Sequence, residues 1–244
     1  IDGARFAEFH QLRLAPLTDA QQREALEKRL GSASAANTLL AYVEEKIPLT
    51  TETKDRVTGN PLMLSMLASV YELRRGVGMP TTVAELYADA SDAMLSRGGA
   101  VSPALRRLLQ AIFFEAHTAQ RREIEDHQLD EAARSLEGAR PSNTHTSQPL
   151  ASEMRDWRQL RAALAEVRDR VARDALPLLS LLQAKPLRLQ SSHLSFQEYF
   201  AACALRDGAR LARLPPWQWQ AWWANVLTLG EEMGEPFARG LATA

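Results

Sequence analysis

The chain has 244 residues, and its 29 basic and 30 acidic side chains leave a formal net charge of −1. This balance gives no long-range field for steering onto nucleic acid or an anionic membrane, so we expect partners to be recognised at a local site or by shape. No window holds the roughly 18 consecutive apolar residues of a membrane-spanning helix. The length exceeds a usual domain of about 100 to 150 residues, which favours two modest folding units.

The cysteine content and the first residues indicate the cellular compartment of the chain. Cys203 is the single cysteine, and no Cys/His cluster has the spacing of a zinc site. We therefore expect a reducing, cytoplasmic compartment. The sequence begins at Ile1, and residues 1–17 lack the basic start and long apolar run of a signal peptide, so we expect a piece of a longer protein.

The chain opens with a predicted strand and a predicted helix. Residues 9–14 (FHQLRL) place two leucines on one face, and Pro16 ends the strand. Thr18 and Gln21 have the spacing of a capping box, in which each side chain accepts a hydrogen bond from the other residue's backbone N–H. The helix is expected to run to about Leu30, before Gly31.

Two more helices are predicted before residue 76. One covers residues 35–46 and ends before Pro48. The other begins at Gly59-Asn60-Pro61, where Asn60 suits the N-cap and Pro61 the first helical position. Apolar residues surround its circumference from 62 to 73, which predicts a central, buried helix. Gly76 is expected to provide its left-handed C-terminal cap.

Residues 82–138 predict three further helices. The first begins near Thr82 and ends near Arg97, and the second runs from Ser102-Pro103 to about His117. The third begins at Asp126 or Gln128 and fades at Gly138. The polar stretch 139–152 is expected to be a mobile loop.

A long helix and a short β-hairpin follow. One apolar stripe at spacings of three and four predicts the helix, which Pro177 closes: Trp157, Leu160, Leu164, Val167 and Val171. Two apolar runs, 178–182 and 187–189, predict a hairpin, although a continued helix followed by one strand is the alternative.

We therefore predict a mainly α fold, in which a small helical bundle precedes a winged-helix-like α+β domain with a short β-hairpin. Residues 1–17 are interpreted as the terminal strand of a preceding nucleotide-binding domain, and residues 18–99 as the first helical domain. Residues 100–206 form the predicted winged-helix-like domain. Residues 207–244 are interpreted as a helical lead-in to a following domain.

The segment SSHLSFQEYFAA, residues 191–202, places a histidine before a helix. Ser195 and Glu198 have capping-box spacing, so the helix is predicted to begin at Ser195, with Leu194 and Tyr199 as a hydrophobic staple. His193 then lies just outside the first turn, where free N–H groups and the helix dipole favour an anion. From the residues alone, a partly buried histidine hydrogen-bonded to backbone is the favoured interpretation, ahead of a contact with a ligand.

Three motifs carry a resemblance to a known family. HLSFQEYFAA resembles the histidine motif in the winged-helix domain of NACHT-type signal-transduction NTPases, the STAND class. Gly59-Asn60-Pro61-Leu62 is similar to the G-x-P motif that opens a helix in the first helical domain of that family. Residues 14–18, with Gln21, are similar to the exit from its nucleotide-binding domain.

The resemblance implies a nucleotide switch. In that family the proline of G-x-P packs on adenine and the histidine contacts the β-phosphate of ADP, which places these roles on Pro61 and His193, with Gly59 and Asn60 beside Pro61. ADP would hold the closed state, and exchange for ATP would permit self-association. The nucleotide would be shared with an N-terminal P-loop domain that also binds its Mg²⁺, and protein partners would use following domains.

This chain carries no predicted catalytic or metal-binding residue. None of its 12 glycines precedes a lysine, so the phosphate-binding loop G-x-x-x-x-G-K-[ST] is absent from it. We expect the chain alone neither to hydrolyse nor to hold nucleotide tightly, whereas the full-length protein would be an ATPase switch. No glycine-flanked nucleophile lies near Ser191, Ser192 or Ser195, and Cys203 is expected to be a core residue.

Three other interpretations remain. A structural helical scaffold or protein-interaction module would explain all three motifs as helix caps. A DNA-binding winged helix would use the arginines of residues 154–174, but acidic residues are interleaved with them, as on a solvated face. Trp217, Trp219, Trp222 and Trp223 are expected to pack against the winged helix or the next domain rather than on a membrane.

Overall fold

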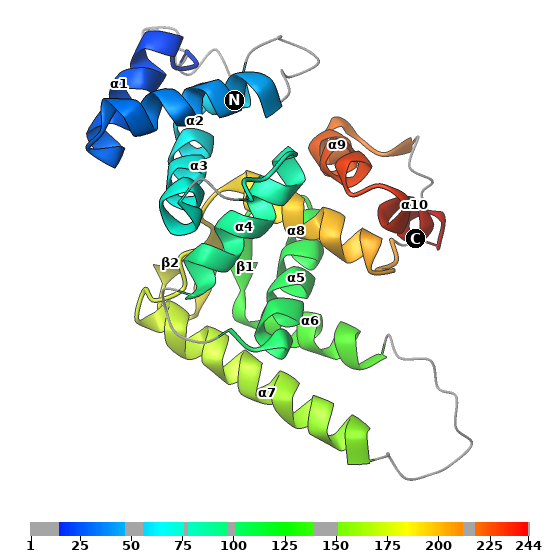
Figure 1. Cartoon of the computed structure of the whole chain (residues 1–244). Coiled ribbons are helices and arrows are strands. Elements are labelled where there is room, and N and C mark those ends of the chain that lie inside the picture. The colour runs from blue at the N-terminus through cyan, green and yellow to red at the C-terminus, as the bar shows by residue number, and fades with distance from the viewer. Residues whose placement is uncertain are drawn as a thin grey trace, which may run out of the picture. The chain divides into compact units, whose positions relative to one another are not determined.

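The computed structural model describes residues 15–46, 56–75, 78–96, 101–138, 151–211 and 218–243 (Figure 1). The strand predicted at residues 9–14 and most of the loop predicted at 139–152 lie outside these ranges. The fold is mainly helical with one small antiparallel sheet, as predicted. The chain divides into two compact units, Ile1–Thr82 and Val83–Ala244, and each is considered by itself.

The first unit begins with two helices whose ends were predicted well. They are α1 (Asp19–Leu30) and α2 (Ala33–Lys46). The Thr18–Gln21 capping box is confirmed, because both reciprocal hydrogen bonds are present. Gly31 ends α1 in the left-handed conformation, with φ 63°, where glycine carries no steric penalty.

The short 3₁₀ helix η2 (Val57–Gly59) leads into α3 (Pro61–Arg74). Asn60 is the N-cap, and its side chain accepts from the Leu62 N–H at 2.9 Å, as predicted. Two details of the prediction are wrong. Arg75, with φ 51°, takes the left-handed cap position expected for Gly76, and Leu73 is 67% exposed, so the last turn of α3 is not buried all round.

A buried polar pair ties α1 to the start of α3. The Thr58 hydroxyl donates to Gln22 Oε1 at 2.7 Å, and Gln22 Nε2 donates to the Leu17 carbonyl at 3.0 Å. Gln22 and Thr58 are almost fully buried. A buried amide whose donor and acceptor are both used favours one arrangement of the surrounding chain.

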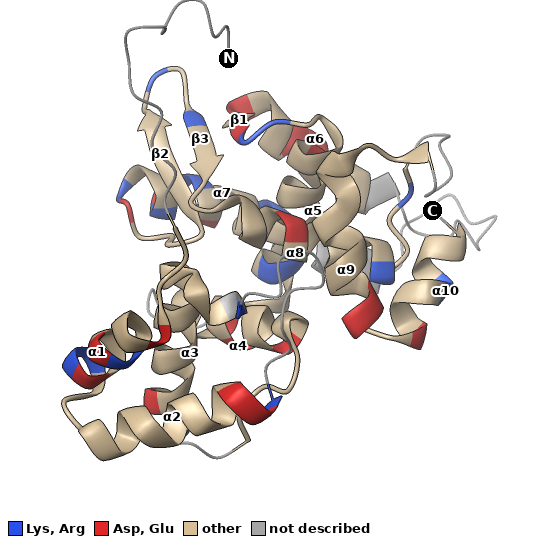
Figure 2. Cartoon of the chain, turned by 90° about the horizontal axis from the view of Figure 1, so that it is seen from above, with Lys and Arg blue, Asp and Glu red and all other residues tan. Residues whose placement is uncertain are grey.

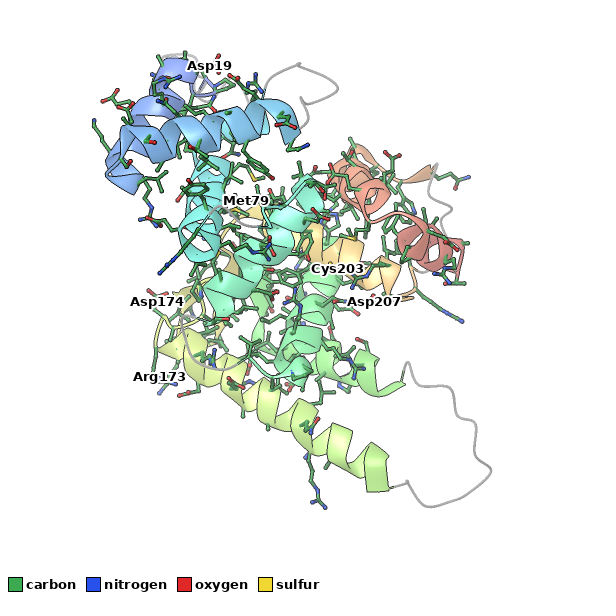
Figure 3. All side chains as sticks on the ribbon, in the orientation of Figure 1. Asp19, Met79, Arg173, Asp174, Cys203 and Asp207 are labelled. Carbon is green, nitrogen blue, oxygen red and sulfur yellow. The ribbon has the colours of Figure 1, made fainter. Side chains whose placement is uncertain are left out.

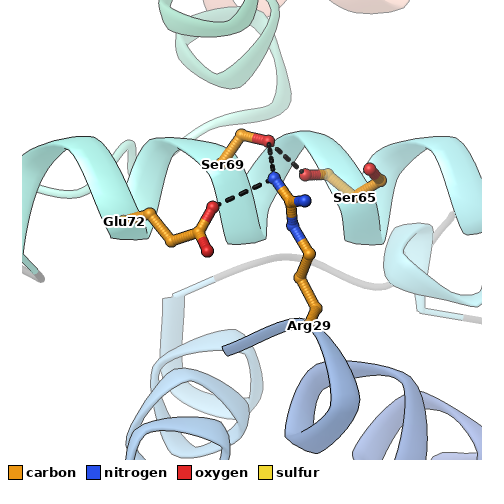
Figure 4. A network of polar contacts seen from close by, with 4 residues as sticks. All are labelled: Arg29, Ser65, Ser69 and Glu72. Carbon is orange, nitrogen blue, oxygen red and sulfur yellow. Dashed lines mark hydrogen bonds and ion pairs between the residues drawn. The ribbon is translucent and has the colours of Figure 1, made fainter. Parts of the chain in front are cut away.

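A second, more exposed contact joins α1 to α3 (Figure 4). The Arg29 guanidinium donates to Glu72 at 3.0 Å and to the Ser69 hydroxyl at 3.4 Å. Both members of the ion pair are roughly half exposed, so its contribution is small, at about 1 kcal/mol or less.

We predict that Thr58→Val lowers the free energy of unfolding of the first unit by about 1 to 3 kcal/mol, because Gln22 Oε1 is left buried without a donor. Chemical denaturation measures this change. Thr38→Val, which removes an exposed hydroxyl bonded within α2, is the matched control and is expected to have a much smaller effect. Equal effects of the two variants would contradict the prediction.

The second unit contains the remaining elements. They are α4 (Val83–Ser96), α5 (Pro103–Thr118), β1 (Glu123–Glu125), α6 (Asp126–Gly138), α7 (Ala151–Ala172), β2 (Leu179–Gln183), β3 (Arg188–Ser191), α8 (Leu194–Arg206), η4 (Ala221–Trp223), α9 (Ala224–Glu232) and α10 (Glu235–Thr243). The division places α4 here, whereas the sequence grouped it with the first helical domain.

The sheet confirms a winged-helix-like arrangement. The predicted hairpin is present as β2 and β3, and the strand order is β1-β3-β2, antiparallel throughout. Strand β1 was not predicted; it pairs Ile124 with Leu189 of β3. The order α5, β1, α6, α7, β2, β3 therefore forms a small helical core with a three-stranded wing.

The core of the second unit is built around α8. Four helices contact it: α4, α5, α9 and α10 (Figure 1). Phe200 of α8 stacks on Phe113 of α5 with ring centroids 5.1 Å apart, and Phe196 meets Tyr87 of α4 edge to face at 5.5 Å. Such aromatic pairs stabilise a core beyond their area alone.

The last two helices depend on glycines for close approach. A Cβ at Gly240 of α10 would lie 2.0 Å from the Leu205 carbonyl oxygen at the end of α8. A Cβ at Gly230 of α9 would lie 2.2 Å from the Phe237 ring. Residues 218–243 thus pack as part of the second unit, while their role as a lead-in to a further domain stays a prediction.

We predict that Gly240→Ala displaces α10 from α8 and lowers the free energy of unfolding by about 1 to 3 kcal/mol, since the new methyl meets rigid backbone. Thermal or chemical denaturation measures the loss. Ala242→Ser changes an exposed position of the same helix and is the control, with an expected change within about 0.5 kcal/mol. An unchanged stability of the Gly240 variant would contradict this packing.

Candidate functional site

His193 lies at the junction of β3 and α8 and is exposed. It occupies the N-cap position in an extended conformation, and its side chain makes no capping hydrogen bond. The predicted helix start at Ser195 is therefore wrong by one residue. The predicted capping box is also wrong, because Glu198 instead accepts from Asn225 Nδ2 of α9 at 2.6 Å.

The physical reason lies in the carbonyl of His193. It accepts from the Phe196 N–H at 3.2 Å and from the Ser191 hydroxyl at 2.5 Å, so the helical turn starts at Leu194. Leu194 is then inside the helix and not before it, so the predicted staple does not form. Ser195, meanwhile, is hydrogen-bonded to the Tyr87 side chain.

Serine side chains fix the backbone before His193. The Ser192 hydroxyl donates to the Pro177 carbonyl at 2.7 Å and lies 3.2 Å from the Ser180 hydroxyl. The Ser192 N–H donates to the Leu178 carbonyl at 3.1 Å. The imidazole of His193 therefore projects from a well-anchored turn.

The start of α8 has the chemistry of an anion site. The first N–H groups of a helix have no acceptor within it and carry the positive end of the dipole. Glu198 is the acidic side chain of α8 nearest to this end of the helix. Burial raises the pKa of Glu198, and the hydrogen bond from Asn225 offsets part of that rise. An exposed imidazole beside these N–H groups can add a further donor to a phosphate oxygen.

The other two motifs meet within the first unit. The Leu17 N–H donates to the Gly59 carbonyl at 2.8 Å, and a Cβ at Gly59 would lie 3.0 Å from Pro16 Cβ. Gly59 is buried, whereas Asn60 and Pro61 are exposed at the start of α3. The exposed face of the Pro61 ring is available for contact with a flat apolar group.

The four candidate residues thus fall into two groups. Gly59, Asn60 and Pro61 belong to the first compact unit, and His193 belongs to the second. Each group is ordered by its own contacts, and the proline and the histidine are both exposed within their units.

Other site chemistry is weak among the described residues. They contain no group of three or more His, Cys, Asp or Glu side chains placed to hold a metal. Cys203 of α8 is buried (Figure 3), and burial raises the pKa of its thiol although a bond to Tyr199 lowers it. A thiol in this state is a poor nucleophile. None of the described helices combines the length and apolar character needed to cross a membrane.

Two arginines of α7, Arg168 and Arg170, are ion-paired. Arg168 binds both Asp126 and Asp130 of α6, at 2.8 and 3.0 Å, and Arg170 binds Glu166 at 2.6 Å. Arg161 stacks over the Trp157 ring. Basic and acidic residues are interspersed over the second unit (Figure 2), which gives no support to a phosphate-binding face on this helix.

Sequence reasoning missed His117, the most unusual polar residue of the second unit. It is fully buried near the end of α5, and neither ring nitrogen has a hydrogen-bond partner among the described residues. Its ring stacks on Trp222 at 5.0 Å and meets Trp223 edge to face at 4.5 Å. The apolar residues around it in α5 and the later tryptophan cluster were the available signals.

We predict that His117 makes the stability of the second unit depend on pH. Burial lowers its pKa from 6.5 to about 4, and an interaction with the Trp222 backbone raises it in part. Because the pKa of His117 is lower in the folded than in the unfolded chain, its contribution to the free energy of unfolding is fully present above about pH 6.5. As the pH falls from 6.5 towards 4, the free energy of unfolding decreases by about 3 kcal/mol. Denaturation as a function of pH measures this.

The control for this prediction is His127, an exposed histidine of α6. His117→Phe should remove the decline between pH 6.5 and 4, whereas His127→Phe should keep it. An identical pH profile for wild type and His117→Phe would contradict the assignment.

The comparisons with known proteins add no family. No protein-family model matches the chain, and no curated protein sequence is significantly similar to it.

Proposed function

We propose that this chain is the regulatory helical and winged-helix part of a NACHT-type STAND NTPase switch, in which His193 and Pro61 contact a bound ADP. One observation carries the proposal. His193 is an exposed N-cap that makes no cap hydrogen bond of its own, at the start of the buried central helix of a winged-helix-like fold. The helix does not need the imidazole, so the side chain is free for a phosphate.

The geometry of the second motif supports the proposal. Pro61 is exposed at the first position of α3, next to a glycine that packs on Pro16. A flat proline face on a rigid helix start suits an adenine ring. ADP would then be shared with a P-loop domain that binds Mg²⁺, and exchange for ATP would release the second unit and permit self-association in a cytoplasmic signalling protein.

The contact of His193 with ADP would favour the closed state but would not be strong enough to maintain it alone. A charge-assisted hydrogen bond contributes about 1.5 to 3 kcal/mol, which changes a two-state ratio by about tenfold to a hundredfold. Packing between domains would supply the remainder. Hydrolysis would belong to the P-loop domain, since the motifs of this chain supply contacts to ADP and no nucleophile.

We predict that His193→Ala speeds ADP release from the intact protein about tenfold or more, because the β-phosphate loses its donor. Stopped-flow fluorescence of a labelled ADP measures the rate. His127→Ala removes another exposed histidine of the same unit and should leave the rate unchanged. Unchanged release and unchanged self-association of the His193 variant would sink the proposal.

Pro61 has a matched control in Pro103, which is also an exposed proline at the first position of a helix. We predict that Pro61→Ala and Pro103→Ala cost similar, small amounts of stability. Only Pro61→Ala should weaken ADP binding to the intact protein, measured by equilibrium titration. Equal affinities of the two variants would remove Pro61 from the site.

The second candidate function is a structural helical scaffold or protein-interaction module. The caps at Thr18 and Asn60 favour it, because they show that these motif residues also serve local structure. Under this alternative, His193→Ala and Pro61→Ala would change stability alone and leave nucleotide binding unaltered.

A further inference from the structure

A turn at the C-terminal end of α5, residues 117–122, touches two segments that are far apart in sequence. We call it the α5 turn. The Gln120 N–H donates to the His117 carbonyl at 2.9 Å, and the Arg121 N–H donates to the Ala116 carbonyl at 3.0 Å. Gln120 has φ 54°, a left-handed conformation that costs energy for a residue with a side chain. The turn thus has the two internal hydrogen bonds of a Schellman-type helix end, and its contacts with neighbouring segments help to offset the cost of the left-handed residue.

On one side, the neighbours are residues 219–223. Trp222 Nε1 donates to the His117 carbonyl at 2.9 Å, and Gln120 Nε2 donates to Gln220 Oε1 at 2.9 Å. The tryptophan rings also enclose the imidazole of His117. This side of the α5 turn is thus fixed by the segment that leads into α9.

On the other side, the neighbours flank His193. Gln197 of α8, fully buried, donates through Nε2 to the Arg121 carbonyl at 2.9 Å. Ser191 and Arg122 exchange two hydrogen bonds, Ser191 N–H to the Arg122 carbonyl at 3.2 Å and Arg122 Nη2 to the Ser191 carbonyl at 3.1 Å. The Ser191 hydroxyl in turn donates to the His193 carbonyl.

We propose that the α5 turn couples the docking of residues 219–223 to the backbone from which His193 projects. When the tryptophans are docked, the turn holds Ser191 and Gln197 and so fixes the start of α8. When they are released, the turn loses the bond from Trp222 and the bond to Gln220, and the hydrogen bonds between Arg122 and Ser191 weaken. The consequence for ADP rests on the proposed function of His193, whereas the coupling itself does not. The undocked segment would thereby favour nucleotide release.

Two neighbouring amides provide the test. The Ser191 N–H is bonded to the α5 turn, while the Ser192 N–H is bonded to Leu178 outside it. Trp222→Phe keeps an aromatic ring but removes the indole donor to His117. We expect amide hydrogen exchange at Ser191 to become about three to tenfold faster, as for loss of one hydrogen bond, with Ser192 unchanged. Gln220→Ala should act in the same direction.

The control is Trp157→Phe, which alters the tryptophan of α7 that contacts Arg161 and should change neither amide. Equal acceleration at Ser191 and Ser192 would mean general loosening and would overturn the coupling, as would no change at Ser191.

ADP release from the intact protein separates the two proposals. If Ser191 responds but neither Trp222→Phe nor His193→Ala alters ADP release, the coupling stands and the nucleotide role fails. If His193→Ala speeds release while Ser191 does not respond to Trp222→Phe, the coupling alone fails.

Discussion

The burial of α8 is the constraint on which the second unit depends. Every residue from Tyr199 to Leu205 is buried, and α4, α5, α9 and α10 pack around the helix. Because packed apolar surface is the dominant favourable term in folding, the position of α8 is set by all four partners together. Both ends of the helix reach solvent, with His193 exposed before the first turn and Asp207 exposed after the last one. The packed body of α8 thus fixes the backbone from which His193 projects.

The polar residues buried around this core add specificity to it. The ring nitrogens of His117 and the Oε1 of Gln197 have no hydrogen-bond partner among the described residues, yet each residue makes a contact that joins the α5 turn to another element. Apolar side chains in place of His117 and Gln197 would be buried at a lower desolvation cost. The presence of His117 and Gln197 in this region therefore fits the proposed switch, in which the contacts of the α5 turn change.

Elements fixed by local chemistry were predictable from the sequence. The caps at Thr18, Asn60 and Ser102 were all foreseen, because a side chain and a backbone N–H two or three residues apart decide each one. The wing hairpin was foreseen from two short apolar runs close together in sequence, and the alternative of a continued helix is wrong. Strand β1 was not foreseen, since its three residues form a strand only by pairing with β3, more than sixty positions later. The start of α4, predicted near Thr82, is confirmed, but its contact with Glu232 of α9, which accepts from the Ala84 N–H at 2.7 Å, was not foreseen.

In the candidate site, too, features set by neighbouring residues were predictable and features set by distant contacts were not. The position of His193 at a helix start was readable, but its role as N-cap was not, because the Ser191 hydroxyl and not a capping box sets the first turn. The contact of Leu17 with Gly59 joins two motifs that sequence spacing alone could not bring together. His117 was missed because a histidine within an apolar helical stripe gives no sign of its partners, which lie about a hundred residues away.

The most direct test of the account is photolabelling of the intact protein with an azido-adenine analogue of ADP, followed by mapping of the labelled peptides. If Pro61 contacts the base, the peptide that contains it is labelled, and excess ADP removes that label by competition. His193→Ala is also expected to lower the labelling at Pro61, because both residues serve one nucleotide. Label that avoids the Pro61 peptide, or that is indifferent to the His193 substitution, would contradict the central claim.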